Sequence, residues 1–516
     1  MLQSKEERQL NHWWKAKKWS YANLNRLFLR WVEQFAGRFW KMANPVSRYG
    51  NPTTITKSSS PESSQFAKTF ITTFAPEILN GYLREIEKWV SKGQWLSDPV
   101  LSYTLIFLGE CIKPKRIWDH LKPHMDNLIA HFVFPILCQS DEDLELFETD
   151  PPEYLHRKLN YYEEVSSPDV AATNFLVALT KSRKKQTFAV LTFVNSVVSK
   201  YESSPDDQKL PTEKEGALRM IGSLASVILG KKSPIADQVE YFFVRHVFPE
   251  FRSPHGFLRA RACDTLEKFE ALDFQNPNNL LIIYRSILDC MTDPELPVRV
   301  EAALALQPLI RHDVIRTSMQ QNIPEIMQQL LKLANEVDVD ALANVMEDFV
   351  EVFSAELTPF AVALCGQLRD TYLRIISELL ERNASRDDDD TYGDFLDEKN
   401  ITALGVLQTI GTLILTLEST PAVLLHLETI LYPVISVTLE NKVYGKFYAI
   451  LLGISFLTSS DLYNEVFEIV DSCTFASKCI SPTMWRVFEL IHKTFKGGAE
   501  LYLEGEDIVV FIFDEA

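Results

Sequence analysis

Hydrophobic positions in residues 293–310 (DPELPVRVEAALALQPLI) recur with helical spacing. The apolar and small residues are separated by steps of four, three, one and three, which places them on one helical face: Val298, Ala302, Ala305, Leu306 and Leu309. We expect Asp293 to cap this helix and Pro294 to occupy its first turn, where a missing N–H costs nothing. Residues 279–291 (NLLIIYRSILDCM) predict a partner helix before it. Two amphipathic helices joined by a short turn cannot bury both apolar faces, so the pattern predicts further helices beside them.

The same pattern occurs earlier in the chain. Residues 258–266 (LRARACDTL) and 298–306 (VRVEAALAL) share the template apolar-Arg-x-x-Ala-x-x-small-Leu, with Arg259 and Arg299 spaced 40 residues apart. A looser match places Ala217 45 residues before Ala262. Periods of about 40–47 residues with two helices per unit are typical of HEAT and armadillo arrays. The alternative is a chance likeness between buried helices of an ordinary helical domain. We predict an all-α fold, a HEAT-repeat (ARM-like) α-solenoid superhelix.

Breaks in the helical pattern predict how this array is divided. HEAT-type repeats, about ten or eleven in all, are expected over residues 1–138, 164–382 and 401–502. The predicted interruptions are a flexible Pro/Ser/Thr-rich link at 44–65, an acidic ordered insertion at 139–163, an acidic mobile loop at 383–400 and an aberrant tail at 503–516 (LEGEDIVVFIFDEA).

Residues 1–42 combine tryptophans with lysines and arginines on a helical pattern. Aromatic and basic side chains together could bind nucleic acid by stacking. We favour a pair of amphipathic helices with buried aromatic rings and solvated lysines.

The predicted insertion at 139–163 is acidic, yet it also carries large apolar side chains such as Leu144, Phe147 and Tyr154. A purely solvating loop does not need them. We therefore expect a segment that packs on the solenoid and presents carboxylates; a surface loop without a partner is the alternative.

The second acidic segment contains four successive aspartates, which repel one another and disfavour a helix: Asp387, Asp388, Asp389 and Asp390. The ligand alternation of an EF-hand is missing, so Ca²⁺ binding is not expected. A basic protein partner is the functional interpretation, and an inert solvated loop is the alternative.

Composition narrows the function classes. The 516-residue chain has a formal net charge of −18, which favours basic protein partners over direct binding of nucleic acid. Its seven cysteines show no CxxC spacing, and Cys263 and Cys290 lie in apolar helical patterns, which fits reduced thiols in the cytosol or nucleus. Residues 5–8 are charged and no apolar run follows, so no signal peptide is expected. The longest apolar run, 447–457, is too short to cross a bilayer, so membrane insertion is not expected.

The sequence offers no constellation that suits catalysis. Residues 230–233 (GKKS) lack the upstream glycine of a phosphate-binding loop and follow a helical pattern. His120, His124 and His131 are close in sequence, but no HExxH motif accompanies them and Pro123 separates the first two. No GxSxG motif occurs. We expect neither an enzyme nor a bound metal or cofactor.

Several blocks together resemble one known family: WWKAKKW (13–19), LELFETDPPEYLHRKLNYYEEVSSPDVAATNFL (144–176), GALRMIGSLA (216–225), HVFPEF (246–251), LRARAC (258–263) and LPVRVEAALALQPLI (296–310). They look like the middle of an importin-beta superfamily receptor (karyopherin), in the importin-seven/importin-eight branch that includes fungal members. The resemblance runs from about residue 11 to about residue 502. It implies a middle fragment, without the first Ran-binding repeats and without the second half of the solenoid.

The resemblance also implies a function. Such a receptor imports proteins into the nucleus, binds the small GTPase Ran in its GTP form, carries basic cargo such as ribosomal proteins and histones, and meets nucleoporins. It would be found in the cytoplasm and nucleus and at the nuclear envelope and pore. By resemblance, the acidic insertion would touch Ran through Asp150, Glu153 and Tyr154, while Asp387–Asp390 would meet basic cargo. A static helical-repeat scaffold and an export receptor of the same superfamily remain alternatives.

Overall fold

The computed structural model describes residues 65, 69–159, 167–230, 233, 235–337, 340–384, 398–417, 421–440, 460–477 and 480–496. Among these residues every regular element is a helix, which confirms the predicted all-α class. The chain divides into two compact units, Met1–Arg157 with Tyr161–Gln275 and Lys158–Asn160 with Asn276–Ala516. The predicted helices at 1–42, almost all of the link at 44–65, Asp387–Asp390 and the tail at 503–516 lie outside the described residues.

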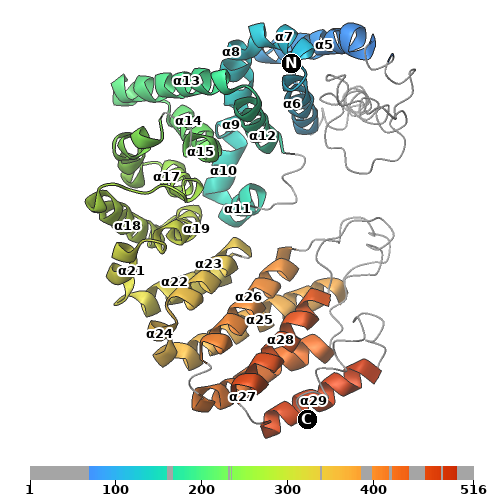
Figure 1. Cartoon of the computed structure of the whole chain (residues 1–516), viewed down its shortest axis with the longest axis vertical. Helices are drawn as coiled ribbons and strands as arrows, with labels where there is room; N and C mark the ends of the chain where they lie inside the picture. The colour runs from blue at the N-terminus through green and yellow to red at the C-terminus, as the bar shows by residue number, and fades with distance from the viewer. Residues whose placement is uncertain are drawn as a thin grey trace. The chain divides into compact units, whose positions relative to one another are not determined.

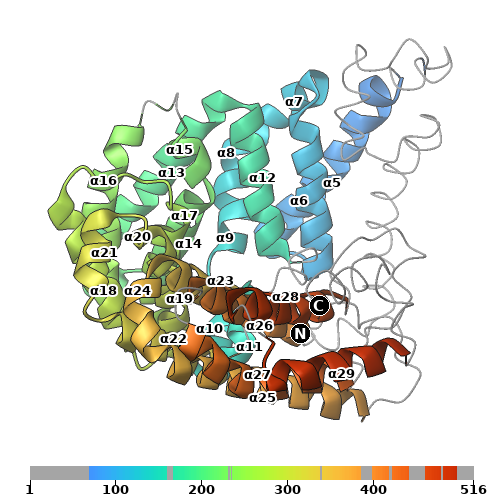
Figure 2. The same ribbon diagram turned by 60° about the horizontal axis from the view of Figure 1, so that its bottom comes forward.

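The first unit is built of packed helices with short connections (Figure 1). Its main helices are α5 (Ala75–Val90), α6 (Asp98–Ile112), α7 (Lys115–Leu121), α10 (Asp141–Thr149), α11 (Pro151–Leu159), α12 (Pro168–Ser182), α13 (Lys184–Ser203), α14 (Pro211–Ser223) and α17 (Gly256–Lys268). Shorter turns are α8 (Met125–Leu128), α9 (Phe134–Leu137), α15 (Ala225–Ile228) and α16 (Val239–Phe242). Helix α12 packs along α6 (Figure 2), and α14 packs between α13 and α17.

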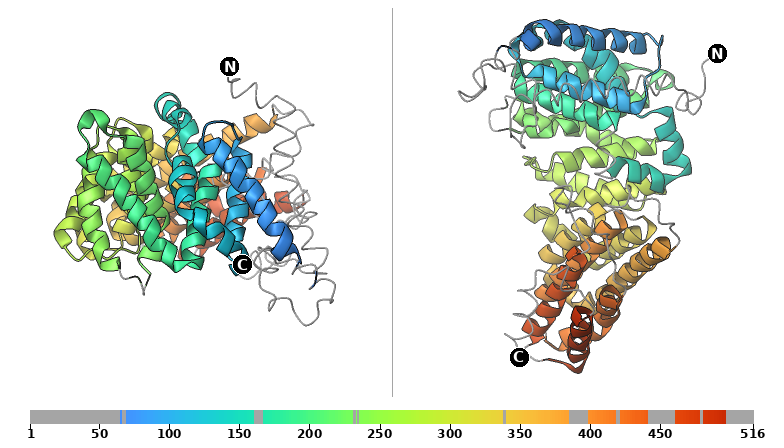
Figure 3. Two further views of the ribbon diagram at one scale, coloured as in Figure 1. Left: turned by 90° about the horizontal axis from the view of Figure 1, so that it is seen from above. Right: turned by 90° about the vertical axis from the view of Figure 1, so that its right-hand side faces the viewer.

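The second unit is built of helix pairs that repeat along the chain. It comprises α18 (Pro277–Met291), α19 (Leu296–Leu304), α20 (Leu306–Leu309), α21 (Asp313–Met319), α22 (Ile323–Glu336), α23 (Asp340–Val352), α24 (Ser354–Leu357), α25 (Ala361–Ala384), α26 (Glu398–Thr416), α27 (Pro421–Glu440), α28 (Ser460–Ser477) and α29 (Pro482–Lys496). Helices α19, α23, α26 and α28 pack in succession as one layer, and α22, α25, α27 and α29 as the other (Figure 3). Because consecutive long helices alternate between the layers, the unit is a stack of helix pairs, as predicted for HEAT-type repeats.

The predicted partner helix at 279–291 is confirmed as α18. The apolar face predicted for the following helix is also confirmed, because Val298, Ala302, Ala305, Leu306 and Leu309 are all buried.

The predicted start of that second helix was wrong. Helix α19 begins at Leu296, with Glu295 as N-cap and Pro297 in its first turn. With Asp293 as the cap, Pro297 would be the first residue required to donate an intrahelical hydrogen bond, and proline has no N–H. The Asp293 carboxylate instead accepts the Glu295 N–H at 3.0 Å in the preceding turn. The helix also breaks at Ala305 and restarts as α20.

One described helix is long and apolar enough to cross a bilayer by length and composition, Val423–Glu440 of α27. A buried core helix meets the same criteria. Helix α27 packs on α25, α28 and α29 and buries one face of apolar side chains, including Leu424, Leu427 and Leu431. Its apolar composition is accounted for by this packing.

Candidate partner-binding site

The acidic segment predicted as an insertion folds as a pair of short helices, α10 and α11 (Figure 1). Ser140 starts α10 with a reciprocal capping box, in which its hydroxyl accepts the Asp143 N–H and the Asp143 carboxylate accepts the Ser140 N–H. Asp150 ends α10, and its carboxylate accepts the Glu153 N–H at 3.3 Å at the start of α11. Local sequence therefore fixes both helix starts.

Apolar contacts hold this helical pair against the first unit. Phe147 is 5% exposed and meets the rings of Tyr154 and of Phe257 on α17 edge-on, at centroid distances of 5.1 and 6.5 Å. Leu155 is completely buried. The large apolar residues noted in the sequence thus serve as anchors.

Polar contacts secure the same region. The Tyr154 hydroxyl accepts a hydrogen bond of 2.8 Å from the amide of Gln139, which is also buried. Burial raises the pKa of Tyr154 above its ordinary value, the nearby Arg261 partly opposing it, so the phenol stays neutral. This bond joins Gln139, two residues before α10, to the middle of α11.

Beneath the helical pair, buried ion pairs connect α12, α14 and α17. Arg219 on α14 donates to the carboxylate of Asp169 on α12 at 2.6 Å and to the Leu137 carbonyl at 3.5 Å. Arg261 on α17 donates to Glu215 at 2.7 Å and to Asp264 at 2.6 Å. Since Glu215 is completely buried, its charge depends on Arg261 for compensation.

The outer face of α10 carries three carboxylates: Asp141, Glu145 and Glu148. Their spacing of i, i+4 and i+7 places them on one helical face, and all three are exposed. None has an ion-pair partner among the described residues. We call these three residues the acidic stripe. By contrast, Glu142 and Glu153 both pair with Arg157, at 3.2 and 2.8 Å.

The residues predicted to touch Ran differ in their exposure. Asp150 is exposed and also caps α11, and the side chain of Glu153 is 45% exposed beside Arg157. Tyr154 is 7% exposed, so its ring supports the helical pair from beneath. The acidic stripe was not singled out from the sequence, although its i, i+4, i+7 spacing was visible there. Asp387, Asp388, Asp389 and Asp390 lie outside the described residues.

The three histidines that lie close together in the sequence are not gathered into one site within the described residues. His120 lies in α7, His124 in the adjoining 3₁₀ turn and His131 in a π turn; all three are exposed and form no group able to share a metal ion. Gly230 follows the helical turn α15, whereas a phosphate-binding loop follows a strand.

The stacked helix pairs define a helical-repeat protein. The α10–α11 pair gives it an ordered acidic surface of a kind that can bind other proteins. Sequence comparisons show which proteins the chain resembles. A family model described as Cse1 matches residues 71–290. The chain is 32% identical over 496 residues to "Nonsense-mediated mRNA decay protein 5" of Saccharomyces cerevisiae and 30% identical over 489 residues to "Importin-8" of Homo sapiens. It is 29% identical over 480 residues to the "Importin beta-like SAD2 homolog" of Arabidopsis thaliana.

These matches cover 94%, 94% and 93% of this chain, but 44%, 41% and 42% of the respective relatives. The chain therefore spans less than half the length of the curated relatives it matches. Over nearly its whole length the chain is similar to members of the importin-beta superfamily.

Proposed function

We propose that this chain is the part of a nuclear transport receptor that binds carried proteins and Ran-GTP during import into the nucleus. The observation that supports this most strongly is the likeness to importins over 94% of the chain. In this function the protein shuttles between cytoplasm and nucleus and passes the pore at the nuclear envelope. It acts by binding, without catalysis.

The helical pair α10–α11 is the proposed Ran contact. Asp150 and Glu153 are joined there by the acidic stripe, while Tyr154 and Phe147 hold the pair in place from beneath. A surface that is already ordered loses little conformational freedom on binding. Its carboxylates attract a basic surface on the partner, so association is fast and weakens as salt rises.

Basic proteins, including ribosomal proteins and histones, are the proposed cargo. The net charge of −18 supports this class of partner because opposite charge steers association. Asp387–Asp390 are proposed as one cargo contact on the basis of their charge.

Nucleoporins are the proposed partners of an apolar edge on the second unit. Large apolar side chains are exposed near each turn that leads from α23 to α25, from α26 to α27 and from α28 to α29: Val352, Phe360, Leu415, Leu425, Phe475 and Trp485. Because α23, α26 and α28 pack in one layer and α25, α27 and α29 in the other, these turns lie along one edge. A row of exposed apolar groups is typical of surfaces that bind other proteins.

The test is binding of the purified chain to Ran loaded with GTP or GDP, at low and at moderate salt. We expect binding that is selective for GTP and that falls about tenfold when Glu145→Lys and Glu148→Lys are combined, because like charges replace attraction. The matched control combines Asp126→Lys and Asp207→Lys, which makes the same charge change at exposed positions away from α10. Asp150→Asn removes the charge of Asp150 but keeps a side-chain oxygen that can cap α11. A change in Ran binding by this variant therefore reports the charge and not the cap.

The outcome also separates the alternatives. Release of a basic cargo by Ran-GTP supports an import receptor, whereas stronger cargo binding with Ran-GTP indicates an export receptor. The proposal is contradicted if the chain binds Ran-GTP and Ran-GDP equally, or if the folded chain binds neither. A static helical scaffold is then the remaining alternative.

A further inference from the structure

The last turn of α13 joins this helix to its neighbours in the first unit. The Lys200 ammonium lies 3.2 Å from the carboxylate of Glu213 in the first turn of α14. Two residues later, the Glu202 carboxylate makes a hydrogen bond with the His246 ring in the π-helical turn η7 (Phe243–Val247). If this turn opened, α13 would therefore lose contacts with two neighbouring elements.

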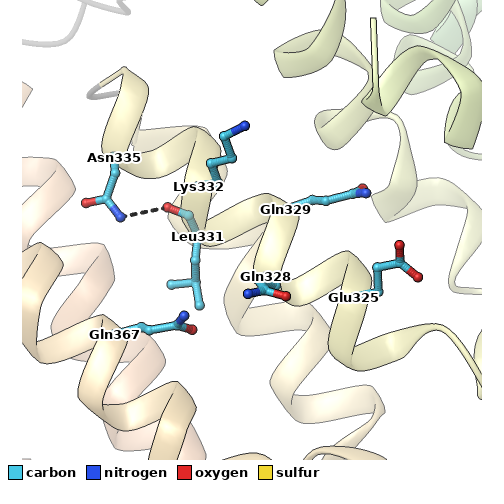
Figure 4. Close-up of a pocket in the computed structure, with 7 residues that line it drawn as sticks. All are labelled: Glu325, Gln328, Gln329, Leu331, Lys332, Asn335 and Gln367. Carbon is cyan, nitrogen blue, oxygen red and sulfur yellow. Dashed lines mark hydrogen bonds between the residues drawn. The ribbon is translucent and has the colours of Figure 1, made fainter.

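Ser204 closes this turn. Its backbone N–H and its hydroxyl both donate to the Lys200 carbonyl, at 3.0 and 2.7 Å. A similar bond closes the end of α22, where the Asn335 amide donates to the Leu331 carbonyl at 3.0 Å (Figure 4). At α13 the side-chain donor is a hydroxyl, so replacing its proton removes the bond. A negatively charged substituent would also face the carbonyl groups at the negative end of the helix dipole.

Ser204 and Pro205 are extended, at the start of an exposed connection. Ser204 has a ψ of 143°, and Pro205 has a φ of −57° and a ψ of 153°. Ser204 is half-buried, while Pro205, Asp206 and Asp207 are exposed. Protein kinases bind their substrates as extended segments, and the proline-directed class selects a serine or threonine followed by proline. The Ser204-Pro205 pair combines this sequence with an extended backbone, which proline favours in the residue before it.

Other Ser-Pro pairs that the structure describes in full are less suitable. Ser253 and Ser481 are buried, at 7% and 9% exposure. Ser167 is followed directly by α12, which begins at Pro168, so the residues after this serine are helical. Among these serines, the fold therefore favours Ser204 as a kinase substrate.

A kinase can reach Ser204 only when the last turn of α13 opens, because the residues before Ser204 are helical and a kinase cleft takes an extended chain. The Lys200 side chain is 63% exposed, so its ion pair with Glu213 adds little to the stability of the closed turn. Helix ends open at a small cost in free energy. The open turn is thus a minor form that a kinase can capture.

We propose that a proline-directed Ser/Thr kinase phosphorylates Ser204 and that the phosphate keeps the last turn of α13 open. The γ-phosphoryl group of ATP forms a bond to the Ser204 Oγ, its bond to ADP breaks, and the hydroxyl proton goes to a base of the kinase. The phosphate carries a charge of about −1.5 to −2 at neutral pH. It cannot donate to the Lys200 carbonyl, repels Glu202 and attracts the Lys200 ammonium away from Glu213. The end of α13 then separates from α14 and η7.

The first test is phosphorylation of the purified full chain with ATP and either a mitogen-activated or a cyclin-dependent protein kinase, followed by mass spectrometry of the modified residues. We expect phosphate on Ser204, and we expect most of it to be lost in the Pro205→Ala variant. Ser203→Ala, at the neighbouring serine, is the matched control and should keep the phosphate. If neither kinase modifies Ser204, or if the phosphate lies on Ser203 or Ser253 instead, the proposal is overturned.

The second test concerns opening of the turn. Glu213→Gln should raise the initial rate of Ser204 phosphorylation about threefold, because it removes an exposed ion pair that holds the turn closed. Glu213 lies nine residues after Ser204, outside the segment that a kinase holds. Glu87→Gln, at an exposed position on α5, is the control and should leave the rate unchanged.

Hydrogen exchange then reports the effect of the phosphate itself. The phosphorylated chain should exchange faster than the unmodified chain in residues 198–204, while exchange in α6 stays the same. An unchanged rate for Glu213→Gln, or unchanged exchange after phosphorylation, would overturn the proposed opening. These measurements use no Ran and no cargo, so their failure is distinguishable from failure of the proposed import function.

Discussion

Arg259 and Arg299 make the same local bond: each donates its Nη1 to the backbone carbonyl six residues earlier. Arg259 reaches Ser253 at 2.8 Å and Arg299 reaches Asp293 at 3.1 Å. Each bond folds the connection preceding a helix back onto its first turns. The arginine shared by residues 258–266 and 298–306 therefore stabilises the same local structure in both places. This shared contact explains why the two blocks have the same residue at a polar position.

Replacing either arginine is expected to destabilise its unit. Arg259→Met removes this charge-assisted hydrogen bond and should lower the free energy of unfolding by about 2 kcal/mol. Arg299→Met removes the same bond together with the ion pair between Arg299 and Glu336, so its loss should be at least as large. Arg285→Met, at an exposed position on α18, is the control and should have little effect. Chemical denaturation monitored by circular dichroism measures the difference. A loss no larger than that of the control would show that the shared bond does not contribute.

Gly216 on α14 is required for close helix packing. A Cβ on this residue would lie 2.5 Å from the Sγ of Cys138 and 3.2 Å from its Cα. We expect Gly216→Ala to cost about 1–3 kcal/mol through overpacking.

The control for this substitution is Gly109→Ala on α6, where a Cβ meets nothing within 4 Å. Alanine there should be neutral or stabilising by up to about 1 kcal/mol, because it favours the helix. Thermal unfolding of both variants tests the contrast. Equal effects would contradict the packing assignment.

Glu110 on α6 should make stability depend on pH. Burial raises its pKa from 4.5 to about 7, although Lys113 opposes the shift. The folded state thus holds a proton that the unfolded state has released, and stability falls as pH rises between about 4.5 and 7. Glutamine cannot ionise, so the Glu110→Gln variant does not undergo this loss. We therefore expect it to become more stable than the wild-type chain as pH rises from about 4.5 to 7, and to remain more stable above pH 7.

The measurement is the difference in melting temperature between Glu110→Gln and the unchanged chain at several pH values. Glu87→Gln, at an exposed position on α5, controls for removal of a charge. A difference that stays constant from pH 4.5 to 8 would be inconsistent with the raised pKa.

Tyr154→Phe should loosen the α10–α11 pair without removing its exposed charges. The substitution leaves the buried amide of Gln139 without its acceptor, at a cost of about 2 kcal/mol. Hydrogen exchange should accelerate in residues 141–157, while α13 and α14 are unchanged. Tyr241→Phe, at an exposed tyrosine, is the control. Unaltered exchange in α10 and α11 would argue against this anchor.

Periodicity was enough to predict the helical class and the buried face of α19. It failed at the start of α19, because the cost of Pro297 at a donor position outweighed the capping tendency of Asp293. The acidic segment was predicted correctly to pack on other helices. Its charge alone would have suggested a solvated loop, but the apolar residues Phe147 and Tyr154 indicated burial.

The anchoring contacts could not be predicted from one sequence. Glu215 and Arg261 are 46 residues apart, and Arg219 and Asp169 are 50 apart. Such pairs form only after the helices stack, since nothing in the local pattern of either residue specifies the other. The exposed stripe, in contrast, is local to α10 and follows from helical spacing alone.

The most direct measurement is hydrogen exchange of the full chain with and without Ran-GTP, with Ran-GDP as the reference. We predict that Ran-GTP slows exchange in residues 141–157, and that Glu145→Lys combined with Glu148→Lys requires about tenfold more Ran-GTP for the same protection while the fold is retained. Protection by both nucleotide forms, or protection confined to other helices, would contradict the assignment of α10–α11 as the Ran contact.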